Sequence, residues 1–312
     1  MKMIPFDNFI IDCYHNLIMT LFNFNKIEPC LLPCLWPWRF DILNSNYLNM
    51  SSFAKDDIML NVFGLNHIVI NFTNYEDYVE KSKEYIDKKE PIIIDIDQFY
   101  VSHHYPNIYN KVHGEHSLIV YNGSCVDCMP VYQGEMSESN LRQGIISDLY
   151  GGRFHVYEKA DNYGDINFSL VKTYFTNFKN AMSNIDSGMS DSCGMNYVIK
   201  ILETYSLSEN DFFDNLESFF KGRWTWEMGK YGHAHSLFIK YLIDKKILDV
   251  SRGLQNEIIL LSDKYEILFK SLFKSKIKRS YKDAINIINE LKNTNNTENN
   301  LFYIINNKIQ KL

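Results

Sequence analysis

The sequence lacks several features that define whole classes of protein. No segment approaches the roughly 18 consecutive apolar residues that a membrane-spanning helix needs, and the first residues lack the apolar core and small-residue cleavage site of a secretory signal. No glycine-rich phosphate loop or nucleotide fingerprint is present. Positive charge is not in excess either, because the net charge is −6 and no basic, aromatic-interleaved stripe occurs. We therefore expect a cytoplasmic protein that binds neither a membrane nor nucleic acid.

The sequence does contain enough apolar side chain for a large core. Its 312 residues are 46% hydrophobic and 15% aromatic, which is typical of one large or two modest globular domains. Strand-like patterns occur in the first half, and the second half is mainly helical. We predict an α+β fold with an antiparallel sheet, divided into a catalytic core over 1–150 and a mainly helical extension over 151–312. Only 293–300 resembles a disordered tail.

The order of helices and strands can be predicted for most of the chain. Apolar spacing predicts helices over 12–24 and 74–88. Strands are predicted at 92–97, 116–121 and 124–128. Asn122-Gly123 favours a two-residue turn, so the last two strands should form a tight hairpin. The later predicted helices are 141–149, 168–182, 192–205, 211–222, 231–246, 252–275 and 281–292.

Cys13 stands at the head of the first predicted helix, after the polar Asp12. Unpaired backbone N–H groups and the helix dipole favour negative charge at that position, so a cysteine there is suited to be a thiolate. The alternative is an inert buried thiol, which is the more common state of a cysteine in an apolar helix. We predict that Cys13 is a nucleophile for acyl transfer through a thioester.

A histidine and a carboxylate follow in an order that suits this nucleophile. His116 directly precedes an apolar strand, and Gly114 before it allows close backbone approach. A tight hairpin would bring His116 close to Asp127, and a Cys–His–Asp order is that of a papain-like cysteine enzyme. The competing candidates are His103, His104 and His113 for the histidine and Asp95 and Asp97 for the carboxylate. The three other histidines also suggest a substrate entrance or a metal site, but their spacing is unlike that of metal ligands.

Further residues suggest an oxyanion donor and a substrate pocket. Asn8 lies five residues before Cys13 and can offer its amide to an oxyanion, although a turn or cap role is as consistent with the sequence. The proline-broken, aromatic segment 30–40 predicts either a packed loop or an aromatic wall that receives an acyl group. On the second interpretation the pocket residues are Trp36, Trp38 and Tyr14.

Two cysteine pairs have spacings found in zinc sites, Cys30-x3-Cys34 and Cys125-x2-Cys128. Structural zinc ligands usually enclose glycine or polar residues, whereas these pairs enclose Leu-Leu-Pro and Val-Asp. We therefore expect reduced thiols and no bound metal or cofactor. A non-enzymatic, zinc-stabilised interaction module is the alternative.

Several motifs together resemble the butirosin-biosynthesis-H-like family. They lie between residues 1 and 145 and comprise Pro5-Phe6-Asp7-Asn8, Asp12-Cys13-Tyr14-His15-Asn16, the 91–97 strand, Gly114-Glu115-His116-Ser117-Leu118-Ile119-Val120, and Val126-Asp127 with Pro130 and Gly134-Glu135-Met136-Ser137. Members of this family are papain-fold acyltransferases of natural-product pathways. They take an acyl group from a carrier-protein thioester and deliver it to an amine.

This resemblance implies a papain-like fold and a role for each matching residue. Cys13 would be the nucleophile, His116 the general base and acid, and Asp127 the orienter of the imidazole. The spacing from His116 to Asp127 is shorter than is common in the family, and Asn8 stands in for the usual glutamine donor. The implied donor is an acyl group on the phosphopantetheine arm of an acyl or peptidyl carrier protein, and the implied acceptor is an amine such as a carrier-bound β-alanyl group. A cysteine peptidase or amidase of the same fold is the alternative.

Overall fold

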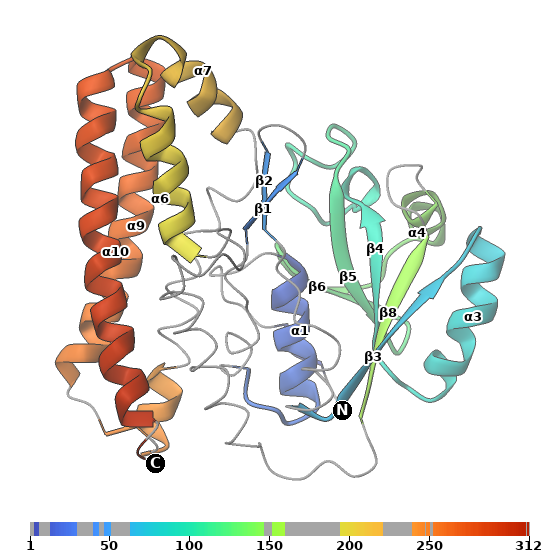
Figure 1. Ribbon diagram of the computed structural model, residues 1–312. Coiled ribbons are helices and arrows are strands. Elements are labelled where there is room, and N and C mark those ends of the chain that lie inside the picture. The colour runs from blue at the N-terminus through green and yellow to red at the C-terminus, as the bar shows by residue number, and fades with distance from the viewer. Residues whose placement is uncertain are drawn as a thin grey trace. The chain divides into compact units, whose positions relative to one another are not determined.

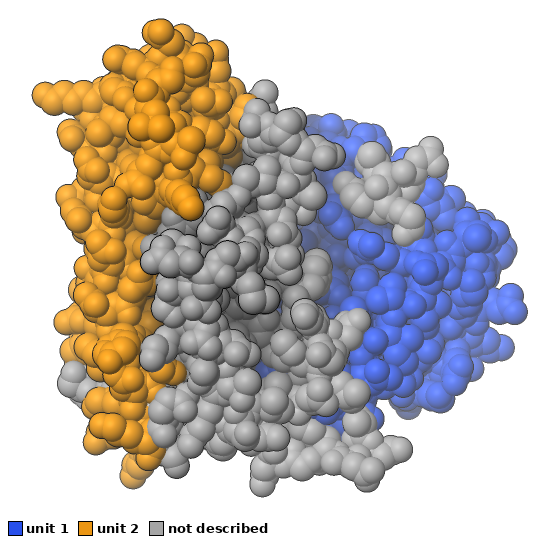
Figure 2. Space-filling model, viewed as in Figure 1, with its two compact units in different colours: residues 1–29, 55–166 blue, residues 30–54, 167–312 orange. Residues whose placement is uncertain are grey.

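The computed structural model describes residues 3–5, 13–29, 40–43, 47–50, 63–146, 152–159, 194–220, 239–246, 248–249, 252–309 and 311. The chain forms two compact units, one of residues 1–29 and 55–166 and the other of residues 30–54 and 167–312 (Figure 2). The predicted division was 1–150 and 151–312. The two divisions differ in the position of the boundary and in the unit to which residues 30–54 belong, which is the second unit in the structure and was the first in the prediction.

The first unit is built on a six-stranded antiparallel sheet. Its strands are β3 (Leu65–Asn71), β4 (Ile92–Asp97), β5 (Glu115–Tyr121), β6 (Ser124–Cys128), β7 (Val131–Gly134) and β8 (Arg153–Lys159). They lie in the order β3-β8-β4-β5-β6-β7, and every neighbouring pair is antiparallel. The predictions of an α+β class and of three neighbouring strands from residue 92 to 128 are confirmed, whereas β3, β7 and β8 were not predicted.

The hairpin between β5 and β6 has the predicted two-residue turn. Tyr121 pairs with Ser124, and Asn122 and Gly123 both have positive φ, at 51° and 76°. Positive φ at both central positions is typical of a type I′ turn, whose twist matches that of the strands. The turn sets the register of the hairpin as far as the pair Ile119 and Val126.

Two helices, α3 (Tyr75–Asp87) and α4 (Glu138–Ile145), cover one face of the sheet (Figure 1). Each begins at a capping residue. The side chain of Asn74 accepts a hydrogen bond from the N–H of Asp77, and Ser137 caps α4 in the same way. The core on this face consists of Phe72, Tyr78, Ile92, Ile94, Ile96, Val101, Leu118, Cys125, Ile145, Phe154 and Val156.

The other face of the sheet packs against α1 (Cys13–Phe24), which contacts β5 and β6 (Figure 1). Residues 14–22 are all buried, so this part of the helix is enclosed on every side. Its first turn is attached to β8 by a 2.9 Å hydrogen bond between the hydroxyls of Tyr14 and Tyr157. Because side chains alternate along a strand, Asp95 of β4 points away from the isoleucine core and toward the side of α1.

The second unit is mainly helical. Besides the hairpin of β1 (Phe40–Leu43) and β2 (Tyr47–Met50), its named elements are α6 (Gly194–Tyr205), α7 (Glu209–Phe220), α9 (Arg252–Lys278) and α10 (Tyr281–Ile309). The predicted helices in these regions are confirmed, and the predicted helix 168–182 lies outside the described residues. None of the described helices is both long and apolar enough to cross a membrane.

The expectation of a disordered tail at 293–300 is wrong. These residues lie inside α10, which continues to Ile309. Thr294, Asn295 and Glu298 are buried there at helical spacing, in line with Leu291. The composition was misleading because polar side chains occupy part of the buried stripe of this helix, where apolar ones are the usual signal.

Candidate functional site

The structure brings Cys13, His116 and Asp127 together, and we refer to these three residues as the Cys–His–Asp site. The Nε2–H of His116 donates a hydrogen bond to Oδ2 of Asp127 at 2.7 Å. The side chains of His116 and Cys13 are also hydrogen-bonded to each other. Because Nε2 is engaged by the carboxylate, Nδ1 is the ring nitrogen left for the thiol.

Three elements supply this site. Cys13 is the first residue of α1, His116 is the second residue of β5, and Asp127 is near the end of β6. Counted from the turn, Ile119 and Val126 are the last paired residues of the hairpin. Asp127 directly follows Val126, and His116 lies three residues before Ile119. The two-residue turn therefore brings the carboxylate and the imidazole to the same part of the hairpin.

Asp127 is fully buried and accepts three N–H donors. His103 and His116 both donate to Oδ2, and the backbone N–H of Met129 donates to Oδ1 at 2.9 Å. Burial alone would raise the pKa of this carboxyl, but the charge of His116 and the hydrogen bonds hold the pKa well below its usual range. Asp127 is therefore a carboxylate at neutral pH.

The charge of His116 follows from its two partners. Burial disfavours the charged ring, but the neighbouring Asp127 and Cys13 outweigh burial and raise the pKa of His116 to about 10. The imidazole is thus protonated at neutral pH and faces the thiol. A thiolate on Cys13 would be paired with this imidazolium and lie at the start of α1, where the helix dipole favours negative charge. Cys13 itself is only partly buried.

Two further histidines surround the site, and sequence reasoning had not given either of them a specific role. The ring of His104 packs edge-on against His116, with ring centroids 4.9 Å apart. Burial and the charge of His116 lower the pKa of His104 to about 4, so His104 is neutral. His103 donates to Asp127 at 2.8 Å. Both come from the loop after β4, and no local pattern in that loop distinguishes them from His113.

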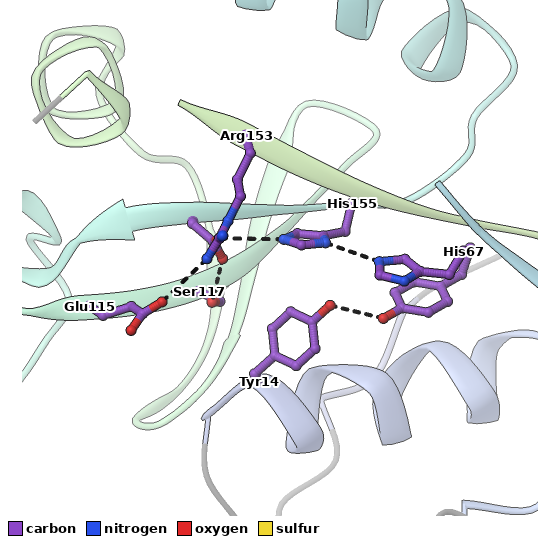
Figure 3. A network of polar contacts seen from close by, with 8 residues as sticks. Tyr14, His67, Glu115, Ser117, Arg153 and His155 are labelled. Atoms are coloured by element: carbon purple, nitrogen blue, oxygen red, sulfur yellow. Dashed lines mark hydrogen bonds and ion pairs between the residues drawn. The ribbon is translucent and has the colours of Figure 1, made fainter. Parts of the chain in front are cut away.

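The rival carboxylate Asp95 has its own partners in a separate network, and Figure 3 labels three of them, Ser117, Arg153 and His155. It accepts hydrogen bonds from Ser117 Oγ at 2.9 Å, Arg153 Nε at 2.5 Å and His155 Nε2 at 3.3 Å. The other nitrogen of His155 lies 3.0 Å from His67 Nε2. Burial opposes the charge of Asp95, but the hydrogen bonds and electrostatic interactions with His155 and Arg153 lower the pKa of its carboxyl. The network holds β4, β5 and β8 together beside the first turn of α1.

The second rival carboxylate, Asp97, is also occupied elsewhere. Its Oδ2 accepts a hydrogen bond from Nδ1–H of His113 at 2.7 Å, and its Oδ1 accepts the N–H groups of Phe99 and Gly114, each at 3.1 Å. The ring of His113 lies flat on Phe99, with centroids 4.2 Å apart. Asp97 therefore belongs to a second Asp–His pair, distinct from the one that contains His116.

Cys125 and Cys128, one of the two cysteine pairs with the spacing of a zinc site, both lie on β6. Three residues apart on one strand, their side chains point to opposite faces of β6. Cys125 lies in the core beneath α3 and α4, where burial raises the pKa of its thiol to about 12. The sulfur of Cys128 instead lies 3.2 Å from Thr20 Oγ1 of α1. These two thiols cannot share one metal ion.

Of the remaining predicted site residues, the structure describes only Tyr14. Tyr14 is buried, with its ring against His155 as well as its hydroxyl on Tyr157. Among the described residues, no group of three or more His, Cys, Asp and Glu side chains is arranged to hold a metal ion. The predictions that lie outside the described residues are Asn8, Trp36, Trp38, Cys30 and Cys34.

Comparison of the chain with protein-family models found no match, and comparison with curated proteins found none either. What this site does is therefore inferred from its chemistry.

Proposed function

We propose that this protein is a cysteine-dependent acyltransferase that forms amide bonds without ATP, on a papain-like fold. The observation that supports this most directly is the double engagement of His116, which contacts the Cys13 thiol on one side and the Asp127 carboxylate on the other. A nucleophile, a base and an orienting acceptor in this order are what nucleophilic catalysis at a carbonyl requires.

In the first half-reaction the thiolate of Cys13 attacks the carbonyl carbon of an acyl thioester. A new carbon–sulfur bond forms, and the donor thiol leaves with the proton carried by His116. The product is an acyl group on Cys13 next to a neutral imidazole. Asp127 stabilises the imidazolium before this step and keeps the same ring nitrogen protonated after it.

In the second half-reaction an amine attacks the acyl-Cys13 carbonyl. The neutral His116 accepts the proton that the amine loses, and the Cys13 thiolate departs to restore the ion pair. Exchange between two thioesters is nearly balanced in free energy and amide formation is downhill, so no nucleotide is consumed. Because water competes with the amine, the acyl group must be held where water is scarce.

The sequence resemblance supports a particular donor and acceptor. We propose the phosphopantetheine arm of an acyl or peptidyl carrier protein as donor and an amine, such as a carrier-bound β-alanyl group, as acceptor. The quoted motifs also resemble those of a cysteine-protease homologue that forms amides in closthioamide (polythioamide) biosynthesis, and we propose a similar reaction for this chain. We accordingly place the reaction in nonribosomal peptide-type natural-product assembly.

Intact-mass spectrometry after exposure to an acyl thioester tests the nucleophile. Wild-type protein should gain the mass of one acyl group, and Cys13→Ala should gain none. Cys128→Ala is the matched control, because the Cys128 thiol contacts Thr20, whereas the Cys13 thiol contacts His116. An acyl adduct that persists on Cys13→Ala would remove Cys13 from the mechanism.

Product analysis with and without an amine tests the acceptor. We expect amide in proportion to added amine and little free acid in its absence. Free acid formed at the same rate whether or not amine is present would identify a hydrolase of the peptidase or amidase type instead.

A further inference from the structure

A second histidine holds the carboxylate that orients His116. Nε2–H of His103 donates to Asp127 Oδ2 at 2.8 Å, and His116 donates to the same oxygen at 2.7 Å. The His103 ring lies flat on Tyr132, with centroids 3.9 Å apart and an interplanar angle of 6°. Its side chain is only 6% exposed. The stacked ring fixes the direction of the N–H toward the carboxylate.

The other ring nitrogen of His103 identifies its tautomer. Nδ1 is buried and has no hydrogen-bond partner among the described residues. A charged ring would place an unpaired N–H at that buried position, whereas the neutral tautomer with hydrogen on Nε2 leaves only a bare acceptor there. His103 is thus a neutral donor to Asp127.

We propose that His103 is a positioning residue which shares Oδ2 of Asp127 with His116 and so limits how strongly Asp127 holds the proton of His116. Each donor draws on the same oxygen, so a second hydrogen bond leaves less negative charge to stabilise the imidazolium. This role rests on the proposed function, in which His116 must release its proton in one half-reaction and accept one in the next. Such exchange is slow when the base holds its proton too tightly.

The other groups around His116 do not duplicate this role. Asp127 and Cys13 are its hydrogen-bonding partners, and both favour the imidazolium. His104 is neutral, and the thiol of Cys125 near Asp127 stays protonated because its pKa is raised to about 12. Replacing His103 by an uncharged residue therefore changes the hydrogen bonding of Asp127 without changing the net charge of the site.

The pH dependence of Cys13 alkylation by iodoacetamide, measured on the Cys13 peptide by mass spectrometry, tests the proposal. An ion-paired thiolate is alkylated at an intermediate rate and reacts faster once His116 loses its proton. The rate of Cys13 alkylation in wild-type protein should therefore rise in two steps as the pH increases, and the second rise reports the loss of the His116 proton. In His103→Phe, which keeps a ring to stack but lacks the donor, the second rise should move upward by roughly half a pH unit. In His103→Gln, which keeps a donor, it should stay near the wild-type position.

His113→Phe is the matched control. Like His103, His113 donates to a buried aspartate and lies flat on an aromatic ring, but its partner is Asp97. The second rise in this variant should coincide with that of wild-type protein. An equal shift in His113→Phe and His103→Phe would show a general effect of losing an Asp–His pair and would overturn the proposal.

The other outcomes are equally decisive. A second rise in His103→Phe that is unmoved or moves downward, or an equal upward shift in His103→Gln, contradicts the role of His103 and leaves the proposed function intact. A wild-type profile with one rise at the pH of an ordinary thiol contradicts the proposed function and this role with it. If His103→Phe does not fold, nitrogen NMR of wild-type protein decides the matter: a bare Nδ1 with a protonated Nε2 on His103 supports the proposal, and a protonated Nδ1 refutes it.

Discussion

Replacing Asp127 by asparagine should disable Cys13 while preserving the shape of the site. Three N–H groups converge on this carboxylate, two on Oδ2 and one on Oδ1. An amide offers only one acceptor oxygen, so in either orientation its NH2 group meets at least one N–H donor. If that NH2 faces His116, the ring must turn Nε2 into an acceptor and carry its hydrogen on Nδ1, which is the wrong tautomer for a base facing Cys13.

The size of the effect follows from the charge that is lost. The pKa of His116 is raised from 6.5 to about 10 by Asp127 and Cys13 against the effect of burial. At about 1.4 kcal/mol per pKa unit this net shift corresponds to roughly 5 kcal/mol, and the two partners together supply at least that much because they also overcome the effect of burial. If Asp127 supplies half, the imidazolium loses about 2–3 kcal/mol of stabilisation in Asp127→Asn, which is on the order of 100-fold in the population of the ion pair. The wrong tautomer lowers the rate further, so we expect Cys13 acylation near neutral pH to slow by about 10²–10⁴-fold.

Rapid-quench measurement of Cys13 acylation by a small acyl thioester is the assay, with intact-mass detection. Asp97→Asn is the matched control, because Asp97 is also buried and also accepts one imidazole and two backbone N–H groups. It should lose comparable stability but keep wild-type acylation. A rate for Asp127→Asn within about tenfold of wild type, or an equal loss in Asp97→Asn, would refute the assignment of Asp127.

The same substitution should change how stability depends on pH. The pKa of His116 is higher in the folded state, so its contribution is complete below about pH 6.5 and is lost as the pH rises through about 10. The carboxyl of Asp127 has a lowered pKa in the folded state, so its contribution is present above its ordinary pKa and is lost in acid. Denaturant unfolding of Asp127→Asn should accordingly show a flatter decline of stability on the alkaline side than wild type.

Two substitutions elsewhere test the packing of each unit. Burial raises the pKa of Glu298 in α10 from 4.5 to about 7, so the folded state loses stability as the pH rises through that window. Glu298→Gln should therefore raise the free energy of unfolding by up to about 3 kcal/mol at alkaline pH and change it little in acid. Glu290→Gln, at an exposed position, is the control and should show no such pH-dependent gain. A gain equal at both pH values would contradict the buried-carboxyl explanation. Gly144→Ala would place a methyl group 2.5 Å from a side-chain carbon of Ile96 beneath α4, so the melting temperature of this variant should fall by an amount equivalent to about 1–3 kcal/mol. Gln143→Ala, at an exposed position, is the control and should be tolerated. An unchanged melting temperature for Gly144→Ala would show that Ile96 can move aside.

Local sequence patterns predicted the elements that carry the site. The apolar run after Cys13 forms a helix that begins at that residue, and Asn122-Gly123 makes the two-residue turn between β5 and β6. Both depend on interactions between residues close in the chain, namely helical spacing and the positive φ that a type I′ turn demands. For this reason His116 and Asp127, eleven residues apart, could be expected to meet before any tertiary structure was known.

Which of the other polar side chains would join them was decided only by the tertiary structure. The placement of β8 between β3 and β4 brings Arg153 and His155 to Asp95, and no pattern predicted β8 or its position. The loop after β4 similarly directs His103 to Asp127 and His113 to Asp97, although the two histidines look alike in the sequence. Contacts between distant segments depend on sheet order and loop path, which single-sequence periodicity does not encode. Sequence alone thus predicted that Cys13, His116 and Asp127 would lie together, and tertiary packing decided which aspartate each histidine contacts.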